Sequence, residues 1–363
     1  YTVFSNDYYH ILLMMEKKSI VFLYTELAGY FLSCITALNE QFGGKIYVVH
    51  WPINPEAPFE FDFPSGIELI EKSKVTNLVD YIDSCSPMTI VCSGWMDKEY
   101  LKVCKVFKKR CNTILTMDNH WTGSLKQRLA CILSPLFLTN RFSHIWVPGE
   151  IQKKFATKLG FKKVLLDYYC SDIDLYTGYY HKHKKEKERL FPKRFVYVGR
   201  YVELKGVFEM WDAFIQAIGS NRDWELWCIG TGDQFSNKME HPQIKHFGFV
   251  QPIKMEEFVK ETSVFVLPSK FEPWGVVTQE YAAAGFPMIV SDKVGAIERY
   301  VQPDVNGFVF KAGDVKSLRV AFENMMKINK EDYISMSRES YRLGTKFTPS
   351  NWADILLDVD VIS

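Results

Sequence analysis

Residues 264–285 read VFVLPSKFEPWGVVTQEYAAAG and decide how the second half of the chain folds. The apolar, β-branched start of this stretch predicts a buried strand, and VVTQEYAAAG predicts a helix. A strand that runs through a Pro-Trp-Gly turn into a helix is typical of an open parallel α/β sheet. In such sheets ligands bind at the carboxyl ends of the strands, where a helix N-terminus offers free amides to an anion.

Two carboxylates stand in this stretch, Glu272 on the turn and Glu280 in the predicted helix. The seven residues between them predict that Glu280 lies about two turns down the same helix, so that both acids face one groove. Carboxylates accept hydrogen bonds from hydroxyl groups, and the helix start attracts phosphate. The stretch therefore suits a sugar that carries a phosphate.

Short apolar runs separated by helical lengths recur along the whole chain, which predicts βα units and parallel sheets. The first series is SIVFLYT from residue 19, KIYVVHW from 45, MTIVCSG from 88, CNTILTMDNH from 111, HIWVPG from 144 and KVLLDYY from 163. The second series is RFVYVGR from 194, WELWCIG from 224, IKHFGF from 244, SVFVLPS from 263, FPMIVSD from 286 and NGFVF from 306. We therefore expect two doubly wound, Rossmann-like domains.

The predicted boundaries follow the composition of the chain. Residues 1–14 are interpreted as an extra segment outside the core, because Met15 begins a run that leads directly into the first strand. The first domain is expected over 15–178 and the second over 195–339, joined by a basic linker at 179–194. The helical tail 340–363 is expected to pack back on the first domain.

Composition narrows the class of protein. A hydrophobic content of 47% indicates a globular fold, and a net charge of +1 gives no general attraction for nucleic acid. The eight cysteines form no C-x-x-C pair, so neither a zinc site nor a disulfide framework is predicted. A reducing cytoplasm is the expected location. No apolar run reaches the roughly 20 residues that span a bilayer.

A second candidate site opens the second domain, in the run Val198-Gly-Arg-Tyr-Val-Glu-Leu-Lys-Gly206. This strand and glycine turn present Arg200 and Lys205 together. A guanidinium and an ammonium group both stay charged at neutral pH, so together they form a suitable grip on a diphosphate. Taken alone, the pair is as easily explained by two solvated surface charges.

The order of the motifs resolves that ambiguity. Gly-Arg-x4-Lys-Gly is followed by WCIGTGD, HFGFVQP, LPSKFEPWGVVTQEYAAAGFPMIVSD and NGFVF. In this order the chain resembles the glycosyltransferases of family 4, which have the GT-B fold. The resemblance covers residues 195–325 by motif, and the first domain by topology and a few positions. It implies two Rossmann-like domains facing a central cleft, with a C-terminal helix returning to the N-terminal domain.

The resemblance also implies a function: transfer of a sugar from a nucleotide diphosphate sugar, with retention of anomeric configuration and without a metal or other cofactor. The donor would be a UDP- or GDP-sugar and the acceptor a glycan or lipid-linked sugar. Bacterial synthesis of polysaccharide, lipopolysaccharide or capsule is the implied setting. The protein would work in the cytoplasm, with peripheral contact at the inner face of the membrane as an open alternative.

Individual residues take roles from the same resemblance. Arg200 and Lys205 would bind the diphosphate, Glu272 would contact the donor sugar, and Glu280 would accept hydrogen bonds from the ribose. The amides of Gly275, Val276 and Val277 would hold the distal phosphate. The segment Phe249, Val250 and Gln251 would line the nucleobase pocket.

In the first domain the resemblance implies two further positions. Gly29 follows the first strand, where the family has a glycine-rich loop near the donor phosphate, although an ordinary turn glycine explains it equally well. His120 ends another strand, where the family often has a histidine that touches the donor sugar. The register leaves Asp118 and Asn119 as alternatives, and a structural histidine is the competing interpretation.

Two other features stay open at this stage. Asp172-Ile-Asp174 matches the Asp-x-Asp pattern that binds metal in the unrelated GT-A glycosyltransferases, but turn and cap carboxylates explain it better. The basic segment 98–110 and the apolar segment 124–138 are candidates for contact with an anionic membrane. A solvated helix face and a core helix, respectively, are the simpler interpretations.

Rival functions remain. A non-catalytic GT-B module that binds a nucleotide or glycan, and a GT-B sugar-nucleotide epimerase or phosphorylase, would share the fold. The complete set of Arg200, Lys205, Glu272 and Glu280 argues against the first, and Glu272 on its Pro-Trp-Gly turn argues against the second. A dinucleotide-dependent oxidoreductase is disfavoured because VGRYVELKG lacks the G-x-G-x-x-G turn.

Overall fold

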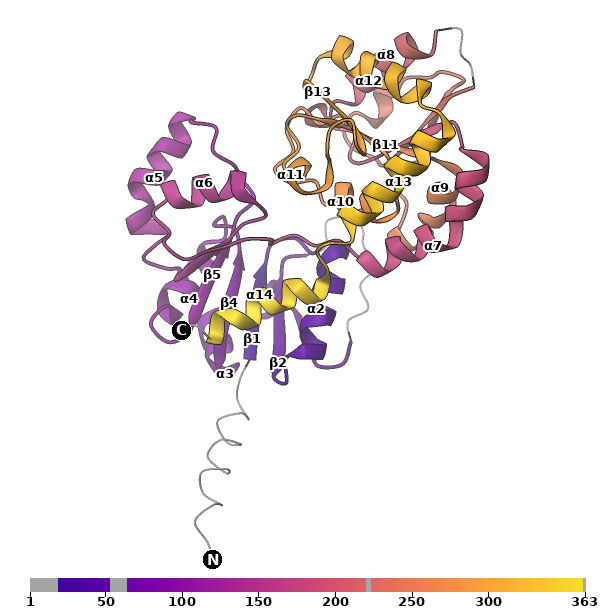
Figure 1. Ribbon diagram of the computed structural model, residues 1–363. Helices are drawn as coiled ribbons and strands as arrows, with labels where there is room; N and C mark the ends of the chain where they lie inside the picture. The colour runs from indigo at the N-terminus through magenta and orange to yellow at the C-terminus, as the bar shows by residue number, and fades with distance from the viewer. Residues whose placement is uncertain (1–18, 53–63, 220–222, 362–363) are drawn as a thin grey trace, which may run out of the picture. The chain divides into compact units, whose positions relative to one another are not determined.

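The computed structural model describes residues 19–52, 64–219 and 223–361. The chain divides into two compact units, Tyr1–Tyr169 with Pro349–Ser363, and Cys170–Thr348 (Figure 1). The extra segment predicted at 1–14 lies outside the described residues. Each unit is an α/β layered structure with its own parallel sheet, as predicted.

Within its described residues, the first unit contains a seven-stranded parallel sheet in the order β3-β2-β1-β4-β5-β6-β7. Its strands are β1 (Ser19–Tyr24), β2 (Lys45–His50), β3 (Ile67–Glu71), β4 (Pro87–Ser93), β5 (Asn112–Thr116), β6 (His144–Trp146) and β7 (Val164–Leu165). Its helices are α2 (Gly29–Gln41), α3 (Leu78–Ser84), α4 (Lys98–Phe107), α5 (Leu125–Phe137), α6 (Glu150–Lys158) and α14 (Pro349–Val361), with a short 3-10 turn at Lys72–Lys74.

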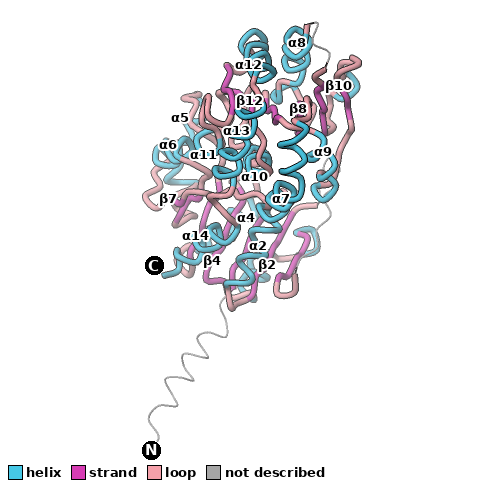
Figure 2. Tube along the Cα trace, turned by 45° about the vertical axis from the view of Figure 1, so that its right-hand side comes forward, coloured by secondary structure: helices cyan, strands magenta, loops and turns pink. Residues whose placement is uncertain are grey.

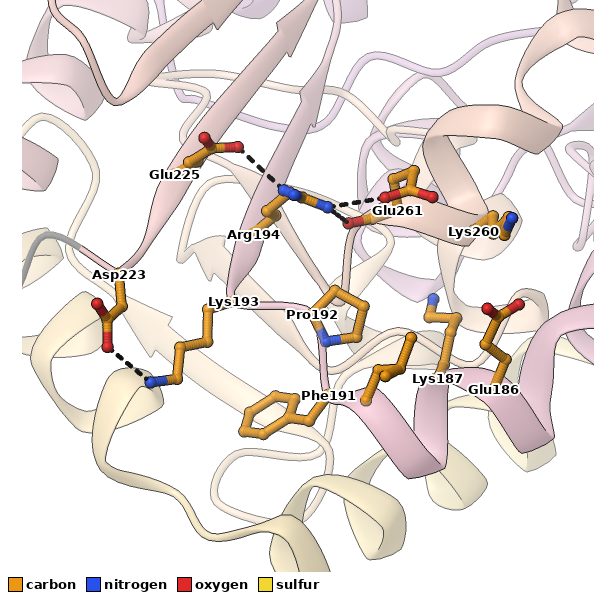
Figure 3. Close-up of a pocket in the computed structure, with 11 residues that line it drawn as sticks. Glu186, Lys187, Phe191, Pro192, Lys193, Arg194, Asp223, Glu225, Lys260 and Glu261 are labelled. Atoms are coloured by element: carbon orange, nitrogen blue, oxygen red, sulfur yellow. Dashed lines mark hydrogen bonds and ion pairs between the residues drawn. The ribbon is translucent and has the colours of Figure 1, made fainter.

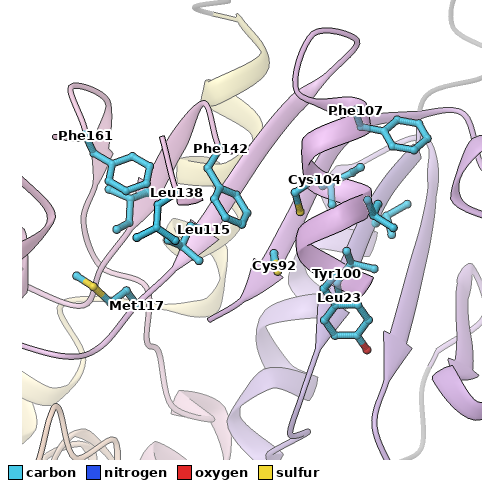
Figure 4. Packing of buried hydrophobic residues seen from close by; sticks show 14 of the residues in the cluster. Leu23, Cys92, Tyr100, Cys104, Phe107, Leu115, Met117, Leu138, Phe142 and Phe161 are labelled. Atoms are coloured by element: carbon cyan, nitrogen blue, oxygen red, sulfur yellow. The ribbon is translucent and has the colours of Figure 1, made fainter. Parts of the chain in front are cut away.

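The core of this unit forms because the central strands are apolar on both faces. Every residue of β1 is buried, as expected for a strand covered by helices on both sides. Figure 4 shows Leu115, Leu138 and Phe142 packed together in this core, with Tyr100 and Cys104 of α4 facing the sheet. Asp97 starts α4 by accepting hydrogen bonds from the amides of Glu99 and Tyr100, at 2.9 and 3.1 Å.

The last helix, α14, belongs to the first unit although it follows the whole second unit in sequence. It lies beside α2 (Figure 2). Trp352 is 1% exposed and stacks on Trp146 with ring centroids 4.9 Å apart. Its indole Nε1 donates a hydrogen bond to the carbonyl of Tyr168 at 2.7 Å. The predicted return of a C-terminal helix is confirmed, and the returning element begins at Pro349 rather than at residue 340.

The second unit has a six-stranded parallel sheet within its described residues, in the order β10-β9-β8-β11-β12-β13. Its strands are β8 (Arg194–Val198), β9 (Glu225–Ile229), β10 (Ile244–His246), β11 (Val264–Leu267), β12 (Met288–Ser291) and β13 (Gly307–Phe310). Its α-helices are α7 (Ile173–Leu190), α8 (Val207–Ile218), α9 (Glu256–Glu261), α10 (Val277–Ala283), α11 (Ile297–Tyr300), α12 (Val315–Lys327) and α13 (Lys330–Gly344). Short 3-10 turns lie at Glu203–Lys205, Phe235–Asn237 and Pro252–Lys254.

The segment assigned from sequence to a basic linker is structured differently. Most of 179–194 forms the second half of α7, and this helix packs on α9, α10 and α13 of the second unit. Two of its basic side chains share a local partner: Lys182 and His183 both contact Glu256, the latter at 2.8 Å. The run of lysines therefore forms part of a folded helix, and the division between the units comes earlier, after Tyr169.

Candidate active site

Two loops of the second unit meet at the carboxyl ends of neighbouring strands. One follows β8 and leads into α8, and the other follows β11 and leads into α10. Gly206, in the first loop, has a φ of +67°, and a Cβ there would lie 2.3 Å from the carbonyl oxygen of Pro268 in the second. Only glycine satisfies both conditions. The loops are therefore in direct backbone contact.

Lys270 fastens the same two loops a second time. Its backbone amide donates to the carbonyl of Leu204 at 2.8 Å, and its Nζ lies 2.7 Å from Glu209 of α8. No sequence pattern identifies this residue, because a lysine that joins two loops looks the same in sequence as a solvated lysine.

Lys205 and Glu272 form an ion pair across the two loops. Their side chains are 20% and 13% exposed, so the pair is largely withdrawn from water yet still reachable. Ser269 donates a second hydrogen bond to Glu272 Oε2 at 3.1 Å. The backbone of Glu272 is bonded on both sides to the chain after β12, through Lys293 and Gly295. Glu272 therefore has a fixed position.

The turn after Glu272 also requires a glycine. Gly275 has a φ of +93°, and a Cβ there would lie 3.1 Å from Cγ of Glu272 and 3.2 Å from Val294. Thr278 is the first residue of this turn whose amide donates a backbone hydrogen bond, and the carbonyl of Gly275 accepts it. The amides of Gly275, Val276 and Val277 thus precede the hydrogen bonds of α10, as expected at a helix start.

Glu280 lies in a different local environment from Glu272. Since α10 begins only at Val277, Glu280 is in its first turn, and the expectation of two acids two turns apart on one helix is wrong. Tyr176 of α7 donates a hydrogen bond to Glu280 Oε2 at 3.1 Å. Burial raises the pKa of Glu280 to about 7, with a further rise from the charge of Asp172 and an opposing effect of the Tyr176 bond.

The remaining predicted donor residues lie near the same strand ends. Arg200 is exposed directly after β8, and its carbonyl accepts a hydrogen bond from Tyr197 at 2.8 Å. The half-buried segment Phe249–Gln251 follows β10, where the carbonyl of Gly248 accepts a bond from Gly230 at 2.7 Å. Arg200, Lys205 and Glu272 thus lie on adjacent loops, and the roles assigned to them stay predictions.

The first unit presents its own strand ends. Gly29 is the first residue of α2, following β1. His120 lies in the loop after β5, and its carbonyl accepts a bond from Gln127 at 2.8 Å. A cavity of about 240 Å³ lies beside this loop, and it is lined by Asp118 and Asn119. Asp118 and Asn119, the two alternatives to His120, are therefore among the residues that line this cavity.

A larger cavity, of about 490 Å³, lies elsewhere in the second unit (Figure 3). It is at the amino end of β8, opposite the strand ends that carry Arg200. Two of its cations are paired: Arg194 lies 2.9 Å from Glu225 and 2.8 Å from Glu261, and Lys193 lies 3.0 Å from Asp223. Lys187 and Lys260 also line the cavity, but four acidic residues line it as well, so its net charge does not favour a diphosphate.

Asp172, from the Asp-x-Asp pattern, is the N-cap of α7. Its side chain accepts a hydrogen bond from the amide of Leu175 at 3.2 Å. This is the role that the simpler interpretation predicted. Among the described residues, no group of three or more His, Cys, Asp or Glu residues is placed to hold a metal ion.

The fold is shared with solved glycosyltransferase structures. The chain aligns with HepE of Anabaena in complex with UDP at a TM-score of 0.71 and 14% identity, covering 95% of this chain and 100% of that one. WaaG, a glycosyltransferase involved in lipopolysaccharide biosynthesis, aligns at a TM-score of 0.69 and 11% identity, covering 95% and 100%. The chain has the GT-B fold. The predicted fold class is confirmed.

Part of the second unit matches a protein-family model, and part of the chain is similar in sequence to curated proteins. Residues 181–342 match the family model described as "Glycosyl transferases group 1". A lipopolysaccharide 1,6-galactosyltransferase of Escherichia coli is 30% identical over 132 residues, 33% of this chain and 36% of that protein. A capsular polysaccharide biosynthesis glycosyltransferase of Staphylococcus aureus is 28% identical over 158 residues, 40% of each chain. The matches span roughly a third of these relatives' length.

Proposed function

We propose that this protein is a retaining, metal-independent glycosyltransferase of family 4. It transfers a sugar from a nucleotide diphosphate sugar, with UDP or GDP as the leaving group, to a glycan or lipid-linked acceptor. The names of its relatives favour a role in the synthesis of lipopolysaccharide, capsule or another polysaccharide. Two structural neighbours, one in complex with UDP and one bound with UDP-2-fluoro glucose, support a nucleotide-sugar donor.

The observation that carries the proposal is the Lys205–Glu272 pair on two loops locked together at Gly206. Sugar transfer breaks the glycosyl–phosphate bond, and the electron pair of that bond goes to the diphosphate. Fixed cations aimed at this oxygen stabilise the transition state more than the ground state. Lys205 and Arg200 would supply that charge, and the amides of Gly275–Val277 would add hydrogen bonds to the distal phosphate.

The carboxylates have separate parts in this proposal. Glu272, held by Ser269 and by its backbone, would accept hydrogen bonds from hydroxyls of the donor sugar. Glu280 would accept them from the ribose, and Phe249–Gln251 would contact the base. The acceptor hydroxyl forms the new bond to the anomeric carbon, and its proton goes to the departing diphosphate. Metal independence follows from the protein's own cations, which take the place of a bound divalent ion.

Membrane contact belongs to the proposal through α5. This helix is not the core helix of the simpler interpretation, because five of its large apolar side chains are 51–84% exposed. They are Leu125, Leu129, Ile132, Leu136 and Phe137. The helix contains Lys126 and Arg128 and no acidic residue, so its charge complements an anionic lipid surface. Among the described residues, no helix is both long and apolar enough to cross a membrane.

A two-part experiment tests the function. UDP, GDP, ADP and their sugars are first screened for an increase in melting temperature, because a ligand that binds only the folded state stabilises it. The stabilising nucleotide sugars are then assayed for release of the nucleoside diphosphate, with and without EDTA. We expect release that EDTA leaves unchanged. Tight binding without turnover would favour the non-catalytic module, and loss of activity restored by manganese would contradict metal independence.

A further inference from the structure

Two connections of the chain join the units, one at residues 169–170 and one at residues 348–349. Any change in the orientation of one unit relative to the other is absorbed by these two connections and by the residues beside them. One side chain of the second unit is hydrogen-bonded to the backbone beside both connections. It belongs to Gln279 of α10 and is 1% exposed.

The side-chain amide of Gln279 uses all of its hydrogen-bonding groups. Its Oε1 accepts a hydrogen bond from the backbone amide of Ser171 at 2.9 Å, beside the first connection. Its Nε2 donates to the carbonyls of Phe347 at 2.9 Å and Gly344 at 3.2 Å, on the side of the second connection. A primary amide has one acceptor oxygen and two N–H donors, so a glutamine of this length satisfies all three backbone partners at once.

Close packing holds the same elements together. Gly344 ends α13, which packs beside α10 (Figure 1). A Cβ at Gly344 would lie 2.2 Å from the amide nitrogen of Ala283 and 2.6 Å from the carbonyl carbon of Ala282, so glycine is needed for this approach. The thiol of Cys170 donates to the carbonyl of Phe347 at 3.6 Å. The backbone beside both connections is therefore fixed to α10 and to itself.

The same helix carries a contact of the proposed donor site. Glu280, which accepts hydrogen bonds from the ribose in the proposed function, directly follows Gln279 in α10. Tyr176 of α7 donates to Glu280 at 3.1 Å, so this part of α10 is also fixed to α7. A ligand that restrains Glu280 restrains the backbone that carries Gln279.

We propose that Gln279 is a positioning residue that transmits occupancy of the donor site to both connections. The inference rests on the proposed function, because Glu280 must contact the donor, and it assigns a role to a residue that touches no substrate. A nucleotide bound at Glu280 fixes α10, and Gln279 then restricts the backbone on the second unit's side of both connections. Donor binding thereby limits how freely the chain between the units can turn before the sugar is transferred.

Hydrogen exchange of the full chain tests this coupling. The probe is whichever of UDP and GDP raises the melting temperature more, and exchange is followed by mass spectrometry with and without it. We expect the nucleotide to slow exchange about threefold or more in peptides covering residues 170–175 and 343–348, as well as in peptides covering α10. A residue that only completes the core would not make exchange at the connections depend on the nucleotide.

Gln279→Met separates coupling from binding, because methionine is of similar size and donates no hydrogen bond. The nucleotide should still slow exchange in α10 but no longer at residues 170–175 and 343–348. Its dissociation constant should stay within about twofold, whereas kcat for release of the nucleoside diphosphate from its sugar should fall about 10-fold. Gln152→Met is the matched control, since Gln152 of α6 is also buried but lies in the first unit. It should leave the effect of the nucleotide on exchange unchanged.

Gln279→Glu gives a second variant whose result depends on pH. A protonated carboxyl accepts from Ser171 and donates to one carbonyl, whereas a carboxylate only accepts. Burial raises the pKa of such a group, so the slowing at the connections should return at about pH 6 and disappear at about pH 8.5. The wild type is measured at the same two pH values, because Glu280 has a pKa of about 7.

The outcomes separate this inference from the proposed function. Slowing in α10 without slowing at the two connections of the wild type would overturn the inference and leave the proposed function intact. Equal slowing at the connections in the wild type and in Gln279→Met would also overturn it. Absence of binding and turnover with every nucleotide sugar would refute the proposed function, and the inference with it.

Discussion

The two units of this chain carry different side chains at the carboxyl edge of a parallel sheet. In the second unit the loops after β8 and β11 carry Lys205, Glu272 and Lys270, and they are joined by charge and by the close contact at Gly206. In the first unit the loops after β1, β4 and β5 carry hydroxyls and one carboxylate. In α/β folds ligands bind at this edge of the sheet, and the loop residues decide which ligand fits.

Removing Lys205 should have the largest effect. Lys205→Ala is expected to lower turnover about 100- to 1,000-fold, because the departing diphosphate loses a preorganised cation. The measurement is steady-state release of the nucleoside diphosphate, with circular dichroism to show that the fold persists. Lys193→Ala is the matched control, since Lys193 lies at the opposite end of β8. A near-normal rate in Lys205→Ala would contradict the role of Lys205 in stabilising the departing diphosphate.

Glu272→Gln should separate catalysis from nucleotide binding. Turnover is expected to fall about 100-fold, since the donor sugar loses a fixed carboxylate. Free UDP or GDP should bind as tightly as before or more tightly, because Lys205 no longer has a competing partner. Titration calorimetry gives the affinity, and Glu203→Gln in the neighbouring loop is the control. Weaker nucleotide binding would show that Glu272 and Glu280 have exchanged roles.

The apolar face of α5 gives the next contrast, since it belongs to the first unit alone. The double change Leu129→Glu and Ile132→Glu should reduce the fraction of protein bound to anionic vesicles about 10-fold or more, because two exposed apolar side chains that would enter the membrane are replaced by charges that anionic lipids repel. Sedimentation with phosphatidylglycerol vesicles measures it. Val320→Glu, on an exposed face of the second unit, should not change binding. Equal binding by all variants would exclude α5 as the contact.

The pKa of Glu280 predicts that the affinity for the nucleotide depends on pH. As pH falls from about 8 to about 6, Glu280 becomes protonated and its capacity to accept hydrogen bonds declines. The dissociation constant should rise about five- to tenfold. In Glu280→Gln, the dissociation constant should vary with pH only through protonation of the phosphates of the nucleotide.

The same shift has a consequence for stability. Because the folded state holds the proton of Glu280 more tightly than the unfolded chain does, stability should fall as pH rises from about 5 to about 7. Glu280→Gln lacks this loss and should melt at a higher temperature than the wild type at about pH 8, with the two converging near pH 5. An equal difference in melting temperature between Glu280→Gln and the wild type at both pH values would contradict the raised pKa of Glu280.

Salt should give the smallest effect. Raising NaCl from about 0.05 to about 0.5 M is expected to increase the donor KM about two- to fivefold, since exposed Arg200 is screened. The KM of a neutral acceptor should remain constant. Equal changes in the donor KM and the acceptor KM would contradict the assignment of charge recognition to Arg200 of the second unit.

Most strands could be predicted from the sequence because their apolar runs are short and bounded. β3 was missed, since Ile67–Glu71 mixes apolar and acidic residues at the edge of the sheet and is only partly buried. The second half of α7 lies where the sequence predicts a linker, because a run of lysines is typical of solvent-exposed chain. Tyr176, Tyr179 and Tyr180 on the buried face of this helix were the contrary signal.

The candidate site was predicted unevenly for a physical reason. Strand–turn–helix junctions are local, so the positions of Arg200, Lys205 and Glu272 at strand ends followed from pattern and resemblance. Partnerships are not local: Tyr176 with Glu280, and Tyr169 with Asp118, join residues 104 and 51 positions apart. No periodicity records such pairs, which is why neither tyrosine was identified in advance.

The return of α14 has a consequence for biosynthesis. The second unit is a continuous stretch of chain, whereas the first depends on Trp352, which closes its core against Trp146 and bonds to Tyr168. At roughly 5–20 residues per second, translation reaches α14 many seconds after β7 has emerged. During that interval the first unit has every strand but an uncovered aromatic surface. The unit that is translated first is therefore completed last, and this nascent intermediate is the state most exposed to aggregation.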